Sequence, residues 1–221
     1  MVGRGRPFAV YGHRGTPLSA QENTLPSFEQ SVAAGCGFET DLRRLADGTI
    51  VLVHDAVVSG FRVSSLTWEE ICELSADVAR LEELRPFSGR SPMILEVKET
   101  GWEQQVVSIT RDWREVVISS FSLEVLAALK AAACEHPLGL IAEQNVPEGA
   151  ALAAALGVDV YFPHYRQVTP ELVASLHEQQ IKVTAWSPNS PTIWNDLLEA
   201  GCDGLITDLP ALAMQWLKTL T

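Results

Sequence analysis

The sequence predicts an α/β protein, a (β/α)8 TIM barrel. Short apolar runs rich in β-formers alternate with helical patterns along the chain, and eight such runs are present. Strands that alternate with helices form parallel βαβ units, and eight of them in one domain fit a closed barrel better than an open sheet. A chain of 221 residues is long enough to bury the core of such a barrel. The expected strands are 8–15, 37–45, 93–99, 115–122, 137–144, 158–165, 182–189 and 203–210.

Helical patterns fill the intervals between these strands, and several end at a glycine. Gly35, Gly157 and Gly201 each stand between a helical stretch and the next strand. Glycine is favoured there because the residue after a helix often adopts a left-handed conformation. The helical stretches that carry the clearest pattern are 22–35, 123–136, 169–180 and 192–201.

One region between the second and third strands departs from this alternation. Residues 49–55 predict an extra short strand, and residues 57–65 predict an irregular loop over the active-site face of the barrel. Two helical pieces follow, at 67–75 and 80–87. Because no linker rich in Pro, Gly or Ser divides the chain, we expect residues 1–221 to form a single domain with an insertion here.

Composition excludes several classes of function. The formal net charge of −12 argues against a nucleic-acid partner, because binding to a phosphate backbone depends on Lys and Arg. No apolar stretch approaches the ~20 residues that a membrane helix needs, so no stable membrane insertion is expected. The amino terminus lacks the apolar region of a signal peptide, which predicts a cytoplasmic protein. The four cysteines are widely spaced and are expected to be reduced thiols. The sequence does not predict the oligomeric state.

Three carboxylates are expected to converge at one end of the barrel. Glu39 and Asp41 share one face of the second strand, and Glu96 and Lys98 share one face of the third, because alternate residues of a strand point to the same side. Both pairs lie toward the carboxyl ends of their strands, where barrel active sites are built. Three converging carboxylates would be costly to bury unless a cation joined them. Oxygen ligands alone predict one divalent cation, Mg²⁺ or Ca²⁺.

Two histidines and two basic residues belong to the same end. His13 and Arg14 end the first strand, and His54 ends the extra strand. Two imidazoles at one barrel mouth could act as acid and base, and Arg14 and Lys98 could offset negative charge on a phosphate. Each of these features alone is common in loops and on surfaces. Together they indicate a site, because all of them fall at the ends of the first three strands or in the loop after the second.

The order and spacing of these residues resemble the glycerophosphodiester phosphodiesterase family. The resemblance covers nearly the whole chain, and its pattern in the first 55 residues is highly specific. The matching segments are HRG (13–15), ENT (22–24), ETD (39–41), DGTIVLVHD (47–55), LEVK (95–98), SSFS (119–122), WSPN (186–189) and GCDGLITDLP (201–210).

This resemblance implies a barrel and gives each residue a role. His13 and His54 would be the acid–base pair, Glu39, Asp41 and Glu96 would hold the divalent metal, and Arg14 and Lys98 would bind the phosphate. The sequence departs from the family at Gln21, where Pro is usual, and in the shortened stretch after Asp55. The subdomain that many members insert before the third strand is also reduced. That region helps to shape the pocket for the alcohol part of the substrate, to which Phe61 and Trp186 could contribute.

The resulting hypothesis is a phosphoric diester hydrolase of lipid metabolism. It would use one metal and two histidines to convert small-molecule glycerophosphodiesters into an alcohol and glycerol 3-phosphate. The nucleophile would be water or a neighbouring hydroxyl of the substrate. Three alternatives stay open: the same chemistry on lysophospholipids or another phosphodiester, a non-catalytic barrel that binds a phosphorylated ligand, and a Schiff-base aldolase acting through Lys98.

Overall fold

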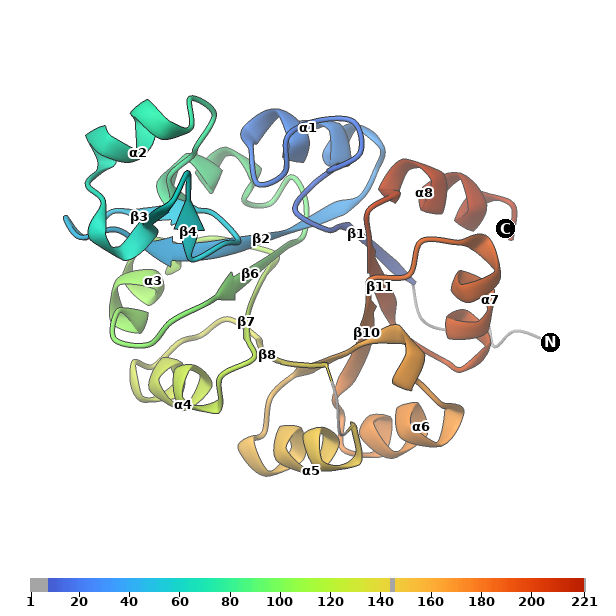
Figure 1. Cartoon of the computed structure of the whole chain (residues 1–221). Coiled ribbons are helices and arrows are strands. Elements are labelled where there is room, and N and C mark those ends of the chain that lie inside the picture. The colour runs from blue at the N-terminus through green and yellow to red at the C-terminus, as the bar shows by residue number, and fades with distance from the viewer. Residues whose placement is uncertain (1–7, 144–145, 221) are drawn as a thin grey trace.

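The structure is a computed structural model that describes residues 8–143 and 146–220. Eight parallel strands form a closed barrel with helices around its outside (Figure 1). Strand β1 pairs with both β2 and β11, which closes the ring. The expected fold class is therefore confirmed; residue 144, the end of one expected strand, lies outside the described residues. The barrel strands are β1 (Ala9–Gly12), β2 (Gly37–Arg44), β6 (Met93–Val97), β7 (Val116–Ser120), β8 (Leu138–Ala142), β9 (Val160–Pro163), β10 (Lys182–Trp186) and β11 (Gly204–Thr207).

The barrel strands separate two apolar cores, one inside the barrel and one under the helices. Ile94, Ile141, Phe162 and Ile206 fill the inside of the barrel. A larger core between the strands and the helices includes residues of opposite orientation, such as Leu95. Toward the carboxyl ends of β2 and β6, charged side chains replace apolar ones on the inner face and form the site described below.

The helices begin where their sequence allows a cap. Thr24, Ser122, Thr169 and Ser190 each accept a hydrogen bond from a backbone N–H of the first helical turn, which satisfies one of the donors that a helix start leaves unpaired. The helices are α1 (Leu25–Ala33), α2 (Trp68–Leu74), α3 (Glu103–Thr110), α4 (Leu123–Ala131), α5 (Val146–Leu156), α6 (Pro170–Glu178), α7 (Pro191–Glu199) and α8 (Pro210–Lys218).

Three glycines let the chain turn from a helix into the next strand. Gly35, Gly157 and Gly201 have φ angles of +85°, +61° and +88°. Residues with a Cβ are strained in this left-handed region. The glycines that the sequence predicts as helix ends are thus confirmed.

The region between β2 and β6 contains a short antiparallel addition to the barrel. Strand β3 (Ile50–Leu52) pairs antiparallel with the end of β2, as the expected extra strand requires. The expectation of an irregular loop at 57–65 is wrong, because β4 (Val57–Val58) and β5 (Phe61–Arg62) form a hairpin and a 3₁₀ turn follows. Ser59 and Gly60 supply the positive φ angles that this tight turn needs. The two helical pieces become α2 and a 3₁₀ helix at Leu81–Phe87.

Candidate active site at the carboxyl ends of the strands

The seven polar residues that the sequence singles out line one cavity of about 230 Å³. It lies at the carboxyl ends of the strands, where the chain leaves β1, β2, β3 and β6 for the following loops. The structure therefore brings together residues from separate parts of the first half of the chain. They are His13, Arg14, Glu39, Asp41, His54, Glu96 and Lys98.

The three acidic residues form a compact cluster. Ligand oxygens of Glu39, Asp41 and Glu96 all lie within 4.8 Å of one another. The three residues are 4%, 1% and 7% exposed. Such close burial of three carboxylates is unfavourable without compensating positive charge, and an oxygen-only donor set suits a hard divalent cation.

The protein's own cations compensate for only part of this charge. Burial, together with the neighbouring Asp41, raises the pKa of Glu39 to about 8. Burial would also raise the pKa of Asp41, but Lys98, Asn23 and Arg14 hold it below its ordinary value. Glu39 therefore carries a proton near neutral pH unless another cation neutralises the cluster. Three carboxylates with ligand oxygens this close, and only Arg14 and Lys98 as basic side chains beside Asp41, fit a metal at these three residues.

Lys98 is fixed between two of the carboxylates. Its Nζ lies 2.7 Å from Asp41 Oδ1 and 2.6 Å from Glu96 Oε1. Burial would lower the pKa of Lys98, but the two carboxylates outweigh burial and raise it. A Schiff-base nucleophile needs a lowered pKa so that its amine is neutral. The geometry therefore argues against the aldolase alternative.

Arg14 borders the cluster through both its backbone and its side chain. Its backbone N–H donates to Glu39 Oε2 at 2.9 Å, and its Nε lies 3.3 Å from Asp41 Oδ2. The guanidinium also pairs with Glu22 at 2.9 Å. A φ angle of +53° turns Arg14 toward the carboxylates directly after β1.

Each histidine is held by an aspartate through the same ring nitrogen. His13 Nδ1 lies 2.7 Å from Asp208 Oδ1, and His54 Nδ1 lies 2.8 Å from Asp55 Oδ1. In both rings Nε2 is then the nitrogen left for a substrate. Burial would lower the pKa of His13, but the hydrogen bond to Asp208 and the charge of Glu39 raise it.

Three further residues support the site, and sequence analysis does not predict a role for any of them. Asn23 donates to Asp41 Oδ2 at 2.8 Å and accepts from Thr40 Oγ1 at 2.7 Å. Asn189 donates to Asp208 Oδ2 at 2.6 Å. Each of them lies in a segment that is visible as a motif: Asn23 in ENT, Asn189 in WSPN and Asp208 in GCDGLITDLP. Their function depends on which strands are neighbours, and a motif alone does not specify that.

The two aromatic residues expected near the substrate lie in different places. Trp186 lines the cavity, and its Nε1 donates to the backbone oxygen of Phe162 at 2.9 Å. Phe61 lies in the β4–β5 hairpin, is 55% exposed, and is not among the described residues that line the cavity.

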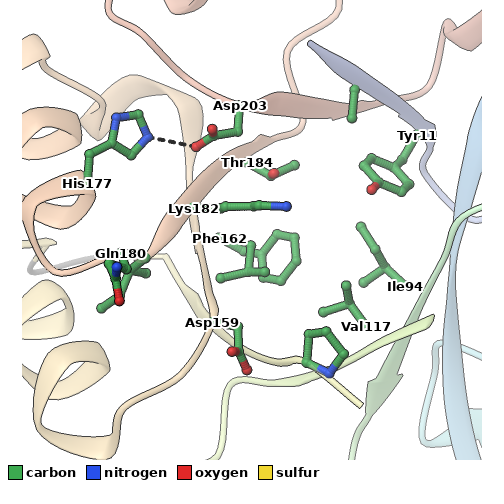
Figure 2. Close-up of a pocket in the computed structure, with 14 residues that line it drawn as sticks. Tyr11, Ile94, Val117, Asp159, Phe162, His177, Gln180, Lys182, Thr184 and Asp203 are labelled. Carbon is green, nitrogen blue, oxygen red and sulfur yellow. Dashed lines mark hydrogen bonds and ion pairs between the residues drawn. The ribbon is translucent and has the colours of Figure 1, made fainter. Parts of the chain in front are cut away.

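A larger cavity of about 760 Å³ lies at the opposite end of the barrel (Figure 2). It is lined by residues at the amino ends of the strands, among them Lys182 and Asp203, and His177 pairs with Asp203 at 2.7 Å. None of the predicted polar site residues lines it. Volume alone therefore does not locate the active site, and we assign the site to the smaller cavity, which contains the carboxylate cluster and both histidines.

Comparison with known proteins identifies the family. The model of the glycerophosphoryl diester phosphodiesterase family matches residues 13–100 and 93–212. The chain belongs to this family. A glycerophosphodiester phosphodiesterase of Caldanaerobacter subterraneus is 28% identical over 91% of this chain and 94% of its own length. The enzyme class expected for a family member, a phosphoric diester hydrolase, is thereby confirmed, and the non-catalytic alternative is set aside.

Solved structures agree with the fold of the family. A glycerophosphodiester phosphodiesterase from Thermotoga maritima superposes with a TM-score of 0.85 at 24% identity, covering 96% of this chain and 99% of the other. An Oleispira antarctica phosphodiesterase in complex with the product sn-glycerol-3-phosphate has a TM-score of 0.87 at 21% identity, covering 95% and 96%. Within the described residues, no helix of this family member is both long and apolar enough to cross a bilayer.

Proposed function

We propose that this protein hydrolyses small glycerophosphodiesters to an alcohol and glycerol 3-phosphate by metal-dependent acid–base catalysis. The observation that carries the proposal is the meeting of three buried carboxylates, two histidines and two basic side chains around one cavity. In the reaction, the oxygen of a water molecule forms a new bond to phosphorus. The bond between phosphorus and the alcohol oxygen breaks, and the alcohol leaves with a proton.

Glu39, Asp41 and Glu96 would hold one divalent cation, Mg²⁺ or Ca²⁺. The raised pKa of Glu39 supports this assignment, because the cluster lacks enough positive charge to ionise fully at neutral pH. When bound, the cation would neutralise the negative charge that develops on a non-bridging phosphate oxygen. Lys98 and Arg14 flank the carboxylates and would orient and neutralise the remaining phosphate oxygens.

His13 and His54 would move the protons. Because an aspartate holds Nδ1 of each ring, the Nε2 atoms would face the substrate. One imidazole would accept the proton of the attacking water, and the other would donate a proton to the departing alcohol oxygen. Asp208 and Asp55 would fix the ring orientations needed for these transfers.

The size of the cavity supports a small substrate. At about 230 Å³ it falls below the ~300–1,000 Å³ typical of sites that enclose drug-sized ligands. A head group with glycerol and phosphate would suit such a volume better than an enclosed acyl chain. The Oleispira relative, which binds sn-glycerol-3-phosphate, has a closely similar fold.

A hydrolysis screen tests the proposal. Glycerophosphocholine, glycerophosphoethanolamine, glycerophosphoglycerol and lysophospholipids would be incubated with Mg²⁺ or Ca²⁺, and release of glycerol 3-phosphate measured. His13→Ala and His54→Ala should each lower kcat by on the order of 10²–10⁴-fold. His177→Ala, which removes a histidine at the opposite end of the barrel, should leave kcat unchanged. Near wild-type turnover in both active-site variants would refute the acid–base pair, and activity that survives exhaustive chelation would refute metal dependence.

A further inference from the structure

The larger cavity, at the amino ends of the strands, exists because small residues lie there on the inside of the barrel. Ala9, Gly204 and Thr184 are neighbours in the register of β1, β11 and β10. Bulky branched side chains normally fill the interior of a TIM barrel in layers, and these three residues are too small to do so. The resulting volume of about 760 Å³ falls within the ~300–1,000 Å³ typical of small-molecule sites.

Three side chains that can donate hydrogen bonds point into this cavity. Lys182 and Thr184 lie on the inner face of β10, and Tyr11 lies on the inner face of β1. Figure 2 shows all three directed toward the same space. Thr184 is 5% exposed, and its hydroxyl has no hydrogen-bond partner within the described residues. Because a buried hydroxyl without a partner is unfavourable, we expect it to bond to a molecule that enters the cavity.

Lys182 supplies a positive charge that is available to an anion. Its ammonium forms no ion pair with any part of the chain that the structure describes. Two carboxylates line the rim, but each has a partner of its own: Asp159 accepts from the backbone N–H of Leu138 at 2.9 Å, and Asp203 lies 2.7 Å from His177 Nε2. Figure 2 shows the Asp203 carboxylate turned toward His177, while Lys182 extends into the cavity.

The floor of the cavity is apolar. Ile94, Val117, Val160 and Phe162 line it and form part of the core inside the barrel. Ile94 and Phe162 also line the active-site cavity, so this layer of side chains separates the two cavities. A ligand that enters from the amino end therefore meets the donors of β10 and β1 together with an apolar floor.

We propose that this cavity binds a monocarboxylate with an apolar tail, such as a medium-chain fatty acid. The carboxylate would accept hydrogen bonds from Lys182, Tyr11 and Thr184, and the tail would cover the apolar floor. The ammonium of Lys182 repels a cation, and a molecule with many hydroxyls would leave some of them unpaired against the floor. One ammonium beside two rim carboxylates suits a single negative charge better than the two charges of a phosphate monoester. The inference concerns a second site and does not depend on the proposed hydrolysis.

Calorimetric titration of the full chain tests the class of ligand. Octanoate would be compared with octanol, which lacks the charge, and with butyrate, which has a shorter tail. We expect one octanoate to bind per chain, about 10–100-fold more tightly than octanol, the range for hydrogen bonds to charged groups. Butyrate should bind at least ~10-fold more weakly than octanoate, because each buried methylene adds to the affinity. Equal affinities for octanoate and octanol, or no binding of octanoate, would overturn the proposal.

Variants locate the bound carboxylate, with circular dichroism to show that each variant is folded. Lys182→Gln should weaken octanoate binding about 10–100-fold and leave octanol binding unchanged. Thr184→Val keeps the shape of the side chain and should weaken octanoate binding about 2–10-fold. Lys218→Gln removes an exposed lysine at the end of α8, outside the cavity lining, and serves as the matched control with wild-type affinity. Wild-type affinity in Lys182→Gln would show that octanoate binds elsewhere and would overturn the proposal.

Competition separates this site from the active site. Glycerol 3-phosphate, the product expected at the active site, should not displace octanoate, because Ile94 and Phe162 lie between the two cavities. Displacement would place octanoate in the active-site cavity and overturn the proposal. Since the readout is binding, the two proposals fail separately. Octanoate binding that depends on Lys182, in a protein that cleaves no glycerophosphodiester, would refute the proposed function and support this second site.

Discussion

His13 Nδ1 lies 2.7 Å from Asp208 Oδ1, although the two residues are 195 positions apart in the chain. The pairing of β1 with β11 closes the barrel and brings the ends of these two strands together. Asn189 extends the contact, since its amide donates to the other oxygen of Asp208 at 2.6 Å and its carbonyl accepts from the Asp208 backbone at 2.9 Å. An imidazole, a carboxylate and an amide therefore form one chain that fixes the ring of His13.

Asp208→Asn should change the pH dependence of the reaction. Burial alone would lower the pKa of His13, and the hydrogen bond to Asp208 is the first of the interactions that instead raise it. Without this carboxylate the pKa of His13 falls, so the limb of the kcat/KM profile that His13 controls should move to lower pH. We expect kcat/KM to decrease on the order of 10²-fold, the lower end of general acid–base contributions, because the ring itself remains.

A second histidine–aspartate pair offers a control for this prediction. His177 and Asp203 are also 2.7 Å apart, at the amino end of the barrel. His177→Gln removes that pair and should leave the pH profile of kcat/KM unchanged. If Asp208→Asn gives the same limb position as the wild type, Asp208 does not tune His13.

The sequence predicts the acidic cluster well because strand periodicity is local. Glu39 and Asp41 had to share a face of one strand, and Glu96 and Lys98 a face of another, whatever the rest of the chain does. Asp208 is different, since its contact with His13 depends on which strands close the barrel. The sequence does not predict the hairpin at 57–62 for a different reason: its strands are two residues long, too short for an alternating pattern to be visible.

Metal binding should become stronger as the pH rises toward 8. The pKa of Glu39 in the fold, about 8, lies above its ordinary value of 4.5, so the folded state binds this proton more tightly than the unfolded chain. The stabilisation that this proton gives to the metal-free protein is complete at pH values below the pKa of Glu39 in the unfolded chain. It is lost as the pH rises through the pKa of Glu39 in the fold, about 8. A cation at the cluster must displace the proton. The increase in melting temperature caused by Mg²⁺ or Ca²⁺, relative to chelator, should therefore be larger at pH 8 than at pH 6.

Proton release gives a direct check of this displacement. Adding the metal at pH 7 to weakly buffered protein should release close to one proton per chain. Glu39→Gln cannot release it, so the variant should bind metal more weakly and show no such pH dependence. Metal binding without proton release in the wild type would mean that Glu39 is already ionised in the metal-free protein.

Asn23 should affect both stability and metal affinity. Its amide supports Asp41 while its backbone adopts a φ angle of +56°, which costs a residue with a Cβ of order 1 kcal/mol. Asn23→Ala keeps the backbone strain and leaves Asp41 Oδ2, a buried carboxylate oxygen, without the hydrogen bond from the amide. We expect the free energy of unfolding to fall by about 1–3 kcal/mol, and metal affinity to fall about 10–100-fold, as for other residues that orient metal ligands.

Asn23→Gly separates the two effects of this residue. Glycine adopts positive φ without strain, so denaturant unfolding should show a smaller loss of stability for Asn23→Gly than for Asn23→Ala. Calorimetric titration with metal should show the same loss of affinity in both variants, because both lack the amide. Wild-type metal affinity in Asn23→Gly would mean that Asn23 acts on the backbone alone.

Two adjacent serines of β7 should respond differently to the same substitution. Ser119 and Ser120 are both buried, but Ser119 Oγ has no hydrogen-bond partner among the described residues. Ser120 Oγ donates to the backbone oxygen of Val97 at 2.7 Å and accepts from the Ser122 N–H at 3.1 Å. Ser120→Ala should therefore lower the free energy of unfolding by about 1–3 kcal/mol, whereas Ser119→Ala should leave it unchanged or raise it by up to ~1 kcal/mol. Urea denaturation of the two variants measures both values. An equal loss in Ser119→Ala would indicate that the Ser119 hydroxyl, which lies beside Glu96 in the strand register, has a partner such as a bound water in the folded protein.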